Sequence, residues 1–179
     1  MKKIILTLFS VFVAAAFSLN AQTTLTGSTG AIPDNGCPVD TPFTATMAES
    51  GAIGSDWEIA NVTIDITHTW DGDLDIRLVS PSGTTLSLSN ENGGSGDNYS
   101  GTQFVDGAPS ILTGSAPFAG QFEPEGGPFA TAFDGEEVNG TWTLAICDEF
   151  SGDIGTVNSW SISFYNGTTT HNGSVGAIP

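Results

Sequence analysis

The sequence predicts an all-β domain, an antiparallel β-sandwich of the jelly-roll-like kind. Apolar residues alternate with polar ones in several short runs, and clusters of Gly, Asp, Asn and Pro separate these runs. Lys and Arg, which favour helices, number only 3 among 179 residues. The chain that follows the N-terminal apolar segment is long enough for one domain with a sizeable core.

The N-terminal residues have the composition of a secretory signal peptide. A short basic start precedes an apolar run over residues 4–17, and the small residue Ala21 ends the stretch that follows. The run is short for a membrane span, which needs about 20 apolar residues. We therefore predict a signal peptide over residues 1–21, no membrane insertion after its cleavage, and a secreted or cell-surface protein.

The chain after the predicted signal peptide is strongly acidic. It contains one basic residue, Arg77, against 20 acidic residues, a formal charge of −19. This charge excludes a nucleic-acid-binding surface, because such binding depends on Lys and Arg that contact phosphates. It fits a solvated extracellular protein and also a protein that binds Ca²⁺ through carboxylates.

Two cysteines, Cys37 and Cys147, follow the export signal. In an oxidising compartment an even number of cysteines predicts a disulfide. Two buried free thiols remain the alternative, since the sequence does not show whether the two Cβ atoms approach each other.

The expected elements begin with residues 22–36, which are rich in Thr, Gly and Ser and are predicted to be a linker or an extended segment. The sandwich domain is expected over residues 37–166, with a first strand over residues 42–47. A half-buried strand then follows, because alternate residues from 62 onward are apolar. Its inward face is predicted to carry Val62, Ile64, Ile66 and the structural residues His68 and Trp70.

An Asp71–Gly72 turn is expected to join this strand to a second one over residues 73–78, as a strand pair. A third strand is predicted over residues 84–88. Residues 89–140 show little regular pattern, which is typical of functional or ion-stiffened loops. Their expected buried anchors are Phe104, Ile111, Leu112, Phe118, Phe122 and Phe133.

The last two strands are predicted to form a hairpin around a second acidic turn, with its core face supplied by Trp142, Leu144, Ile146, Trp160, Ile162 and Phe164. Beyond it, residues 173–179 (GSVGAIP) repeat residues 27–33 (GSTGAIP) with one change. This offset of about one domain length predicts a tandem array, with residues 167–179 as a linker and the start of a second repeat. Chance recurrence of a Gly-rich linker remains the alternative.

Several motifs occur in a fixed order along the chain. They are HTWDGDL at residues 68–74, SPSGT at 80–84, PFAGQFEP at 117–124, GTWTL at 140–144 and GDIG at 152–155. As a set, they resemble the P domain, also called the P/Homo B domain. This β-sandwich follows the catalytic domain in kexin- and furin-like subtilases and in many secreted bacterial proteases.

The resemblance implies a non-catalytic accessory module of a secreted or cell-surface protein, for stabilisation or for adhesion to protein or glycan. Tandem P domains or a protease catalytic domain are the neighbours it implies in the parent protein. The alternative is the C-terminal accessory domain of a secreted serine endopeptidase whose catalytic domain is absent from this chain.

The residues themselves also argue against enzymatic activity. A Ser-His-Asp triad needs a histidine base beside a serine, and the chain has only His68, on an apolar strand face, and His171, in the tail. No Gly-x-Ser-x-Gly segment occurs, and the histidines and cysteines lack zinc-ligand spacing. We therefore predict that the chain is not an enzyme.

Calcium is the expected cofactor. Ca²⁺ takes six to eight oxygen ligands, and P domains of secreted bacterial proteases are often calcium-bound. The acidic turn after residue 70 is not an EF-hand, because Ile76 stands where that loop needs Gly. Ligands from separate loops are expected instead, with Asp73 the first choice among Asp71, Asp73, Asp97, Asp106, Asp148 and Asp153. The alternative for each is that it caps a turn by bonding its own backbone.

Overall fold

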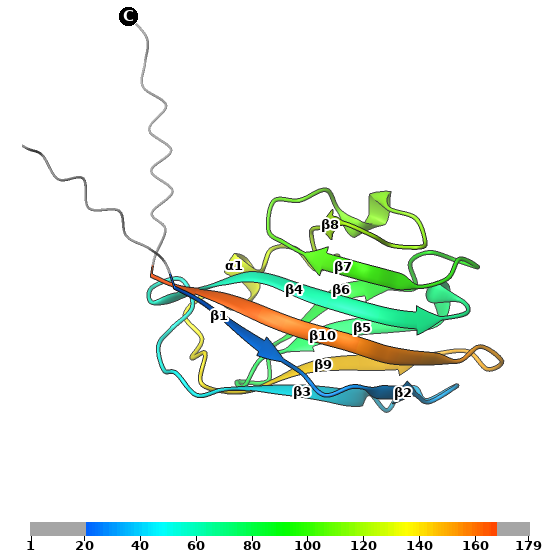
Figure 1. The fold of residues 1–179 in the computed structure, drawn as a ribbon, viewed down its shortest axis with the longest axis horizontal. Coiled ribbons are helices and arrows are strands. Elements are labelled where there is room, and N and C mark those ends of the chain that lie inside the picture. Colours follow the sequence, from blue (N-terminus) through cyan, green and yellow to red (C-terminus); the bar gives the residue numbers. More distant parts are fainter. Residues whose placement is uncertain (1–20, 168–179) are drawn as a thin grey trace, which may run out of the picture.

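Two packed β-sheets make up the computed structural model, which describes residues 21–167 (Figure 1). The predicted signal peptide, apart from Ala21, and the repeated tail segment lie outside the described residues. The all-β sandwich prediction is confirmed. Within residues 21–167, no helix is both long enough and apolar enough to cross a membrane.

The first sheet has the strand order β1-β10-β4-β7-β8, and β2 pairs with the start of β10. All of its pairings are antiparallel except that of β7 with β8. Its strands are β1 (Ala21–Thr26), β2 (Gly30–Ile32), β4 (Trp57–His68), β7 (Tyr99–Phe104), β8 (Gln121–Phe122) and β10 (Gly155–Asn166).

The second sheet is antiparallel throughout, in the order β3-β9-β5-β6. Its strands are β3 (Thr41–Met47), β5 (Leu74–Val79), β6 (Thr85–Asn90) and β9 (Gly140–Asp148). Short helical turns connect the strands: η1 (Asp71–Asp73), η2 (Ile111–Thr113) and α1 (Phe129–Ala132).

The core lies between the sheets and follows from the period-2 patterns, because alternate residues of a strand point to one face. Ile64 and Ile66 of β4 and Trp142 of β9 are fully buried, as predicted. The indole N–H of Trp142 donates to the carbonyl oxygen of Val138 over 3.0 Å. Burial of such large side chains is the main favourable contribution to folding, at roughly 25 cal/mol for each Å² of apolar surface.

The connections differ from the predicted hairpins. β4 lies in one sheet and β5 in the other, and the same holds for β10 and β9, so both acidic turns cross between sheets. Alternation shows which side chains face the core, but two strands of opposite sheets face the core just as two strands of one sheet do. The expected strand pairs are therefore wrong as pairs, although each strand is present.

Three local expectations also need correction. Trp70 follows the end of β4 and is 43% exposed, so it does not share the buried face of that strand. Leu112 is 62% exposed on η2, whereas the neighbouring Ile111 is the buried anchor. Residues 22–36, expected as a linker or an extended segment, supply the extended strands β1 and β2, which pair with β10, so the sandwich begins before the expected residue 37.

Candidate functional site

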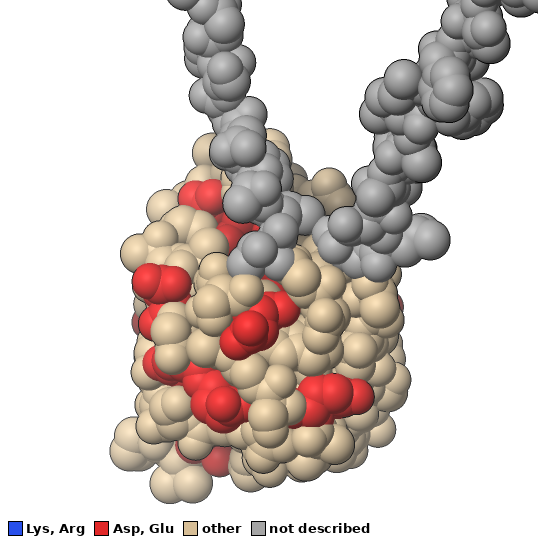
Figure 2. Space-filling model, turned by 90° about the vertical axis from the view of Figure 1, so that its left-hand side faces the viewer, with Lys and Arg blue, Asp and Glu red and all other residues tan. Residues whose placement is uncertain are grey.

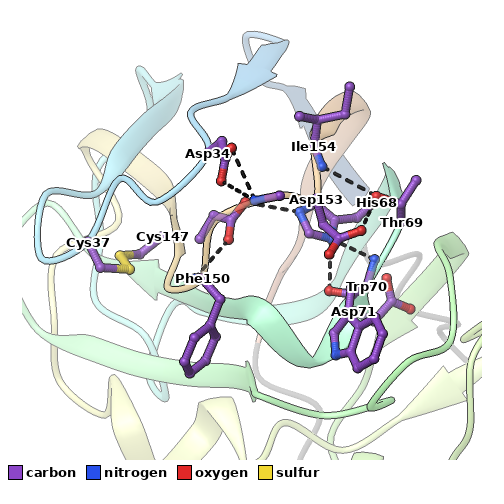
Figure 3. Close-up of polar contacts among 12 residues, drawn as sticks. Asp34, Cys37, His68, Thr69, Trp70, Asp71, Cys147, Phe150, Asp153 and Ile154 are labelled. Atoms are coloured by element: carbon purple, nitrogen blue, oxygen red, sulfur yellow. Dashed lines mark hydrogen bonds and ion pairs between the residues drawn. A yellow bond between two sulfur atoms is a disulfide. The ribbon is translucent and has the colours of Figure 1, made fainter.

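The two acidic turns lie next to each other at one end of the sandwich. In the first sheet His68, the last residue of β4, pairs with Gly155, the first residue of β10. In the second sheet Leu74, the first residue of β5, pairs with Asp148, the last residue of β9. The two crossovers therefore run side by side from sheet to sheet. We call residues 69–73 and 149–154 the paired arches (Figure 3).

A buried histidine and a buried carboxylate link the arches. His68 Nε2 lies 3.2 Å from Oδ2 of Asp148, and neither side chain is exposed. Nδ1 of the same ring lies 2.9 Å from the carbonyl oxygen of Trp70. Gly155 packs against the ring so closely that a Cβ there would overlap it. Both ring nitrogens of His68 therefore face protein groups.

Asp71 is fully buried in the middle of the first arch. Its Oδ1 accepts a hydrogen bond from the backbone N–H of Asn98 over 2.8 Å, while its Oδ2 has no hydrogen-bond partner. Burial raises the pKa of Asp71 to about 7, and the carboxylate of Asp97 adds to this. The Asn98 hydrogen bond and the nearby His68 oppose the rise in pKa.

The Gly-rich loop of residues 93–98 covers Asp71. The backbone N–H groups of Asp71 and Gly72 donate to the carbonyl oxygens of Gly96 and Gly94. A Cβ on Gly72 would come within 3.0 Å of the Gly94 Cα, so only glycine permits this close approach. The loop then returns to β7 through Asn98, whose positive φ of 76° suits asparagine.

Asp73 ends the first arch and lies under the second. Its pKa is raised, first by burial and then by the carboxylates of Asp148, Asp153 and Asp34. Asp153 is fixed in turn, because the Thr69 hydroxyl donates to its Oδ1 over 2.8 Å. The same hydroxyl accepts from the backbone N–H of residue 154, which ties the two arches together (Figure 3).

A third loop, residues 33–40, is fastened to the same end. Cys37 and Cys147 form a disulfide with their Cα atoms 5.3 Å apart, which confirms the predicted pairing. The Asp34 carboxylate accepts from the backbone N–H of Gly152 over 3.1 Å. The backbone N–H of Cys37 donates to the carbonyl oxygen of Asp148. Three segments that are distant in sequence therefore form one cross-linked group of loops.

The predicted calcium ligands separate into groups. Asp97 lies close enough to Asp71 to raise its pKa, and Asp148 and Asp153 do the same for the pKa of Asp73. Asp106 lies elsewhere, at the start of α1, and accepts from the backbone N–H groups of residues 129 and 130 over 2.7 and 2.9 Å. Within residues 21–167, no three His, Cys, Asp or Glu side chains are arranged to hold a metal ion. Among the six predicted ligands, Asp71 is the one whose carboxylate has a buried oxygen, Oδ2, without a hydrogen-bond partner.

The sequence pattern missed three residues of this site: Asp34, Thr69 and Asn98. Asp34 lies in a segment without alternation and Thr69 on the outward face of the predicted strand, and only the fold brings them to the second arch. Asn98 had a detectable signal, because asparagine after a Gly-rich run favours a positive φ and a fixed loop return.

The family model described as the proprotein convertase P-domain matches residues 57–164, more than half of the chain. The chain belongs to the P-domain family. This confirms the resemblance seen in the motifs. The matched range covers both arches and the strands from β4 to β10, apart from the last two residues of β10, whereas β1, β2, β3 and the loop with Cys37 precede it.

The P domain has relatives among longer proteins. It is 31% identical over 134 residues to Leupeptin-inactivating enzyme 1 of Streptomyces exfoliatus, covering 74% of this chain and 24% of that protein. It is 33% identical over 135 residues to the Transglutaminase-activating metalloprotease of Streptomyces mobaraensis, covering 75% of this chain and 14% of that protein. The chain thus spans about a quarter or less of these relatives.

A solved structure shares the fold of the P domain. It is the Aeromonas sobria serine protease in complex with its chaperone, 22% identical, with a TM-score of 0.51. The match covers 86% of this chain and 28% of that one. At this identity the likeness supports the β-sandwich and nothing further.

Proposed function

We propose that this P domain is a non-catalytic accessory module of a secreted or cell-surface protease-related protein. The observation that carries the proposal is the burial of His68. A general base must reach the proton that it removes, and His68 is fully buried with both ring nitrogens against protein groups.

The surroundings of His68 support a structural role. Its ring nitrogens face Asp148 and the Trp70 carbonyl, its backbone N–H donates to Asn98, and Gly155 closes the remaining ring edge. None of these partners is a nucleophile of the serine, cysteine or threonine type. The histidine instead joins two arches that leave different sheets, which stabilises the end of the sandwich.

The test is an assay of the purified chain, residues 22–179, with casein and a peptide library. We expect no hydrolysis above that of a mock purification. Hydrolysis that co-elutes with the folded chain, and is lost in a His68→Ala variant that still melts cooperatively, would contradict the proposal.

Calcium is the second part of the proposed function, with Asp71 rather than Asp73 as the leading ligand. What supports it is the unpartnered Oδ2 of Asp71 in a fully buried position. A bound Ca²⁺ would balance the negative charge of this buried carboxylate. Because no three acidic side chains converge among residues 21–167, the remaining ligands would have to be backbone carbonyls and water, which Ca²⁺ accepts.

An accessory domain of a secreted protease is the more specific candidate. What favours it is that one relative is named a metalloprotease and another a leupeptin-inactivating enzyme, and that both are much longer than the part that this chain matches. In such a protein the module would stabilise a catalytic domain or help it to engage substrate. A catalytic domain in the same reading frame would support this candidate, whereas further P-domain repeats would support a surface array. The disulfide fits export in either case.

A further inference from the structure

Large apolar side chains are exposed at the end of the sandwich that carries the paired arches. Six such side chains are exposed among the described residues, and four of them lie on the three cross-linked loops. The exposed fractions of these four are 73% for Val39, 43% for Trp70, 54% for Phe150 and 68% for Ile154. Exposed apolar groups gathered in one region mark interaction sites more often than scattered ones do.

The backbone beneath these side chains is held firmly. Val39 follows the Cys37–Cys147 disulfide by two residues. The backbone N–H of Phe150 donates to the Asp148 carboxylate, and that of Ile154 donates to the Thr69 hydroxyl. A surface fixed in this way loses little conformational entropy when a partner binds, which favours affinity.

The first and last described residues lie together at one end of the sandwich. Ala21, at the start of β1, pairs with Asn166, at the end of β10, so the described chain enters and leaves at the same end. Figure 1 shows that this end lies opposite the one where β4 finishes and β10 begins. The arches therefore lie at the end of the sandwich away from the points where the described chain begins and ends.

The charges on the three loops all have one sign. Every charged residue in 33–40, 69–73 and 148–155 is acidic. Asp71, Asp73 and Asp148 are buried and Asp40 pairs with Arg77, which leaves Asp34, Glu149 and Asp153 to face solvent. Acidic side chains also lie at the opposite end of the molecule, where Figure 2 shows no basic side chain. The acidic charge therefore favours a basic partner at either end, and the exposed apolar side chains indicate that the partner binds at the arch end.

We propose that Val39, Trp70, Phe150 and Ile154 form a docking surface for a segment of another protein that combines Lys or Arg with apolar side chains. An exposed indole beside carboxylates suits such a segment, because a cation binds both the ring face and the acids. The proposal rests on the proposed function of an accessory module and names its partner class.

The experiment measures binding of a fluorescent peptide, GLKLRLKLG, to purified residues 22–179 by anisotropy, in EDTA and again in Ca²⁺. Matched peptides replace every Lys and Arg by Glu or every Leu by Ser. We expect the cationic leucine peptide to bind about tenfold more tightly than either, by electrostatic and apolar complementarity together. Trp70→Ala should weaken binding about threefold to fivefold, and Phe150→Ala should weaken it as well.

Matched variants elsewhere serve as controls. Leu112→Ala is the control for Phe150→Ala, because it removes a similarly exposed apolar side chain from η2. Asp134→Asn is the control for Asp34→Asn: each removes one exposed charge, but only Asp34 lies beside the second arch. The controls should bind like the unsubstituted chain, and Asp34→Asn should bind more weakly. Equal loss in Leu112→Ala and Phe150→Ala would show non-specific adsorption and overturn the proposal.

Other occupants would give different outcomes. Absence of peptide binding would overturn the proposal, as would binding of cellohexaose in place of the peptide. Sedimentation that shows self-association, lost in Phe150→Ala, would assign the surface to a second copy instead. None of these results touches the proposed non-catalytic function, which is decided by the hydrolysis assay.

Discussion

The Asp71→Asn variant gives the sharpest test of the buried arch. In the folded chain the pKa of Asp71 is raised from 3.8 to about 7 by burial. The folded state then binds this proton more tightly than the unfolded state does, so Asp71 reduces stability as the pH rises from about 4 through 7. The amide of asparagine retains an acceptor for the Asn98 N–H and removes the buried charge.

The size of the effect follows from the pKa shift. About three pKa units at 1.36 kcal/mol each give roughly 4 kcal/mol as the largest loss between pH 4 and pH 8. For a domain of this size that equals about 8–16 °C in melting temperature. Asp73 and Asp106 also have raised pKa values, so the informative quantity is the difference between the unsubstituted chain and the variant.

The assay is a set of melting curves at about pH 5 and pH 8 in EDTA. We expect the unsubstituted chain to lose stability at the higher pH and Asp71→Asn to lose clearly less. The exposed Asp134→Asn removes one charge elsewhere and should leave the pH dependence unchanged. If Asp71→Asn and the unsubstituted chain show the same pH dependence, the reasoning about the orphaned oxygen is wrong.

The same variants test calcium. At a hundred times its dissociation constant, a ligand of the folded state adds about 2.7 kcal/mol of stability. At pH 8, Ca²⁺ should therefore raise the melting temperature of the unsubstituted chain more than Mg²⁺ does at equal ionic strength, and Asp71→Asn should lose this difference. An equal rise with both ions would reduce the effect to charge screening. Loss of the Ca²⁺ effect in Asp73→Asn alone would mean that Asp71 is the wrong ligand.

Three further changes test the packing around the site. Replacing Cys37 and Cys147 together by Ser should lower the free energy of unfolding by about 2–5 kcal/mol in urea titrations, because the disulfide closes a long loop; an unchanged midpoint would contradict this. Gly27→Ala should cost about 1–3 kcal/mol, since its Cβ would overlap the Trp160 indole; an unaffected melting temperature would mean that β1 is not docked as described. Asp106→Ala should cost about 1 kcal/mol by removing the acceptor at the start of α1, and a Ca²⁺ response unaltered by it would separate this residue from calcium binding.

The strands were predictable from the sequence, whereas their partners were not. The alternation from Val62 to His68 determines which side chains are buried, because successive residues of a strand point to opposite faces. It carries no information on whether the next strand pairs within the same sheet or crosses to the other. The turn at Asp71–Gly72 is compatible with both, and the structure shows a crossover.

The site was predictable in part for a similar reason. The clustering of acids around Asp71 and Asp148 follows from turn residues that the sequence displays. The contributions of Asp34 and Thr69 depend on which loops meet in space, and no local pattern encodes this. The exposure of Trp70 could not be deduced from alternation, since the strand ends two residues before it.

The most direct test of a non-catalytic P domain is labelling with a fluorophosphonate probe, which reacts with an activated serine. Intact-mass measurement of purified residues 22–179 after prolonged incubation would detect any adduct, and a serine protease run in parallel would show that the probe is active. Because His68 is buried against Asp148 and the Trp70 carbonyl, we expect the mass of the chain to remain unchanged. A stoichiometric adduct on one serine of the folded chain, abolished by unfolding, would contradict the account.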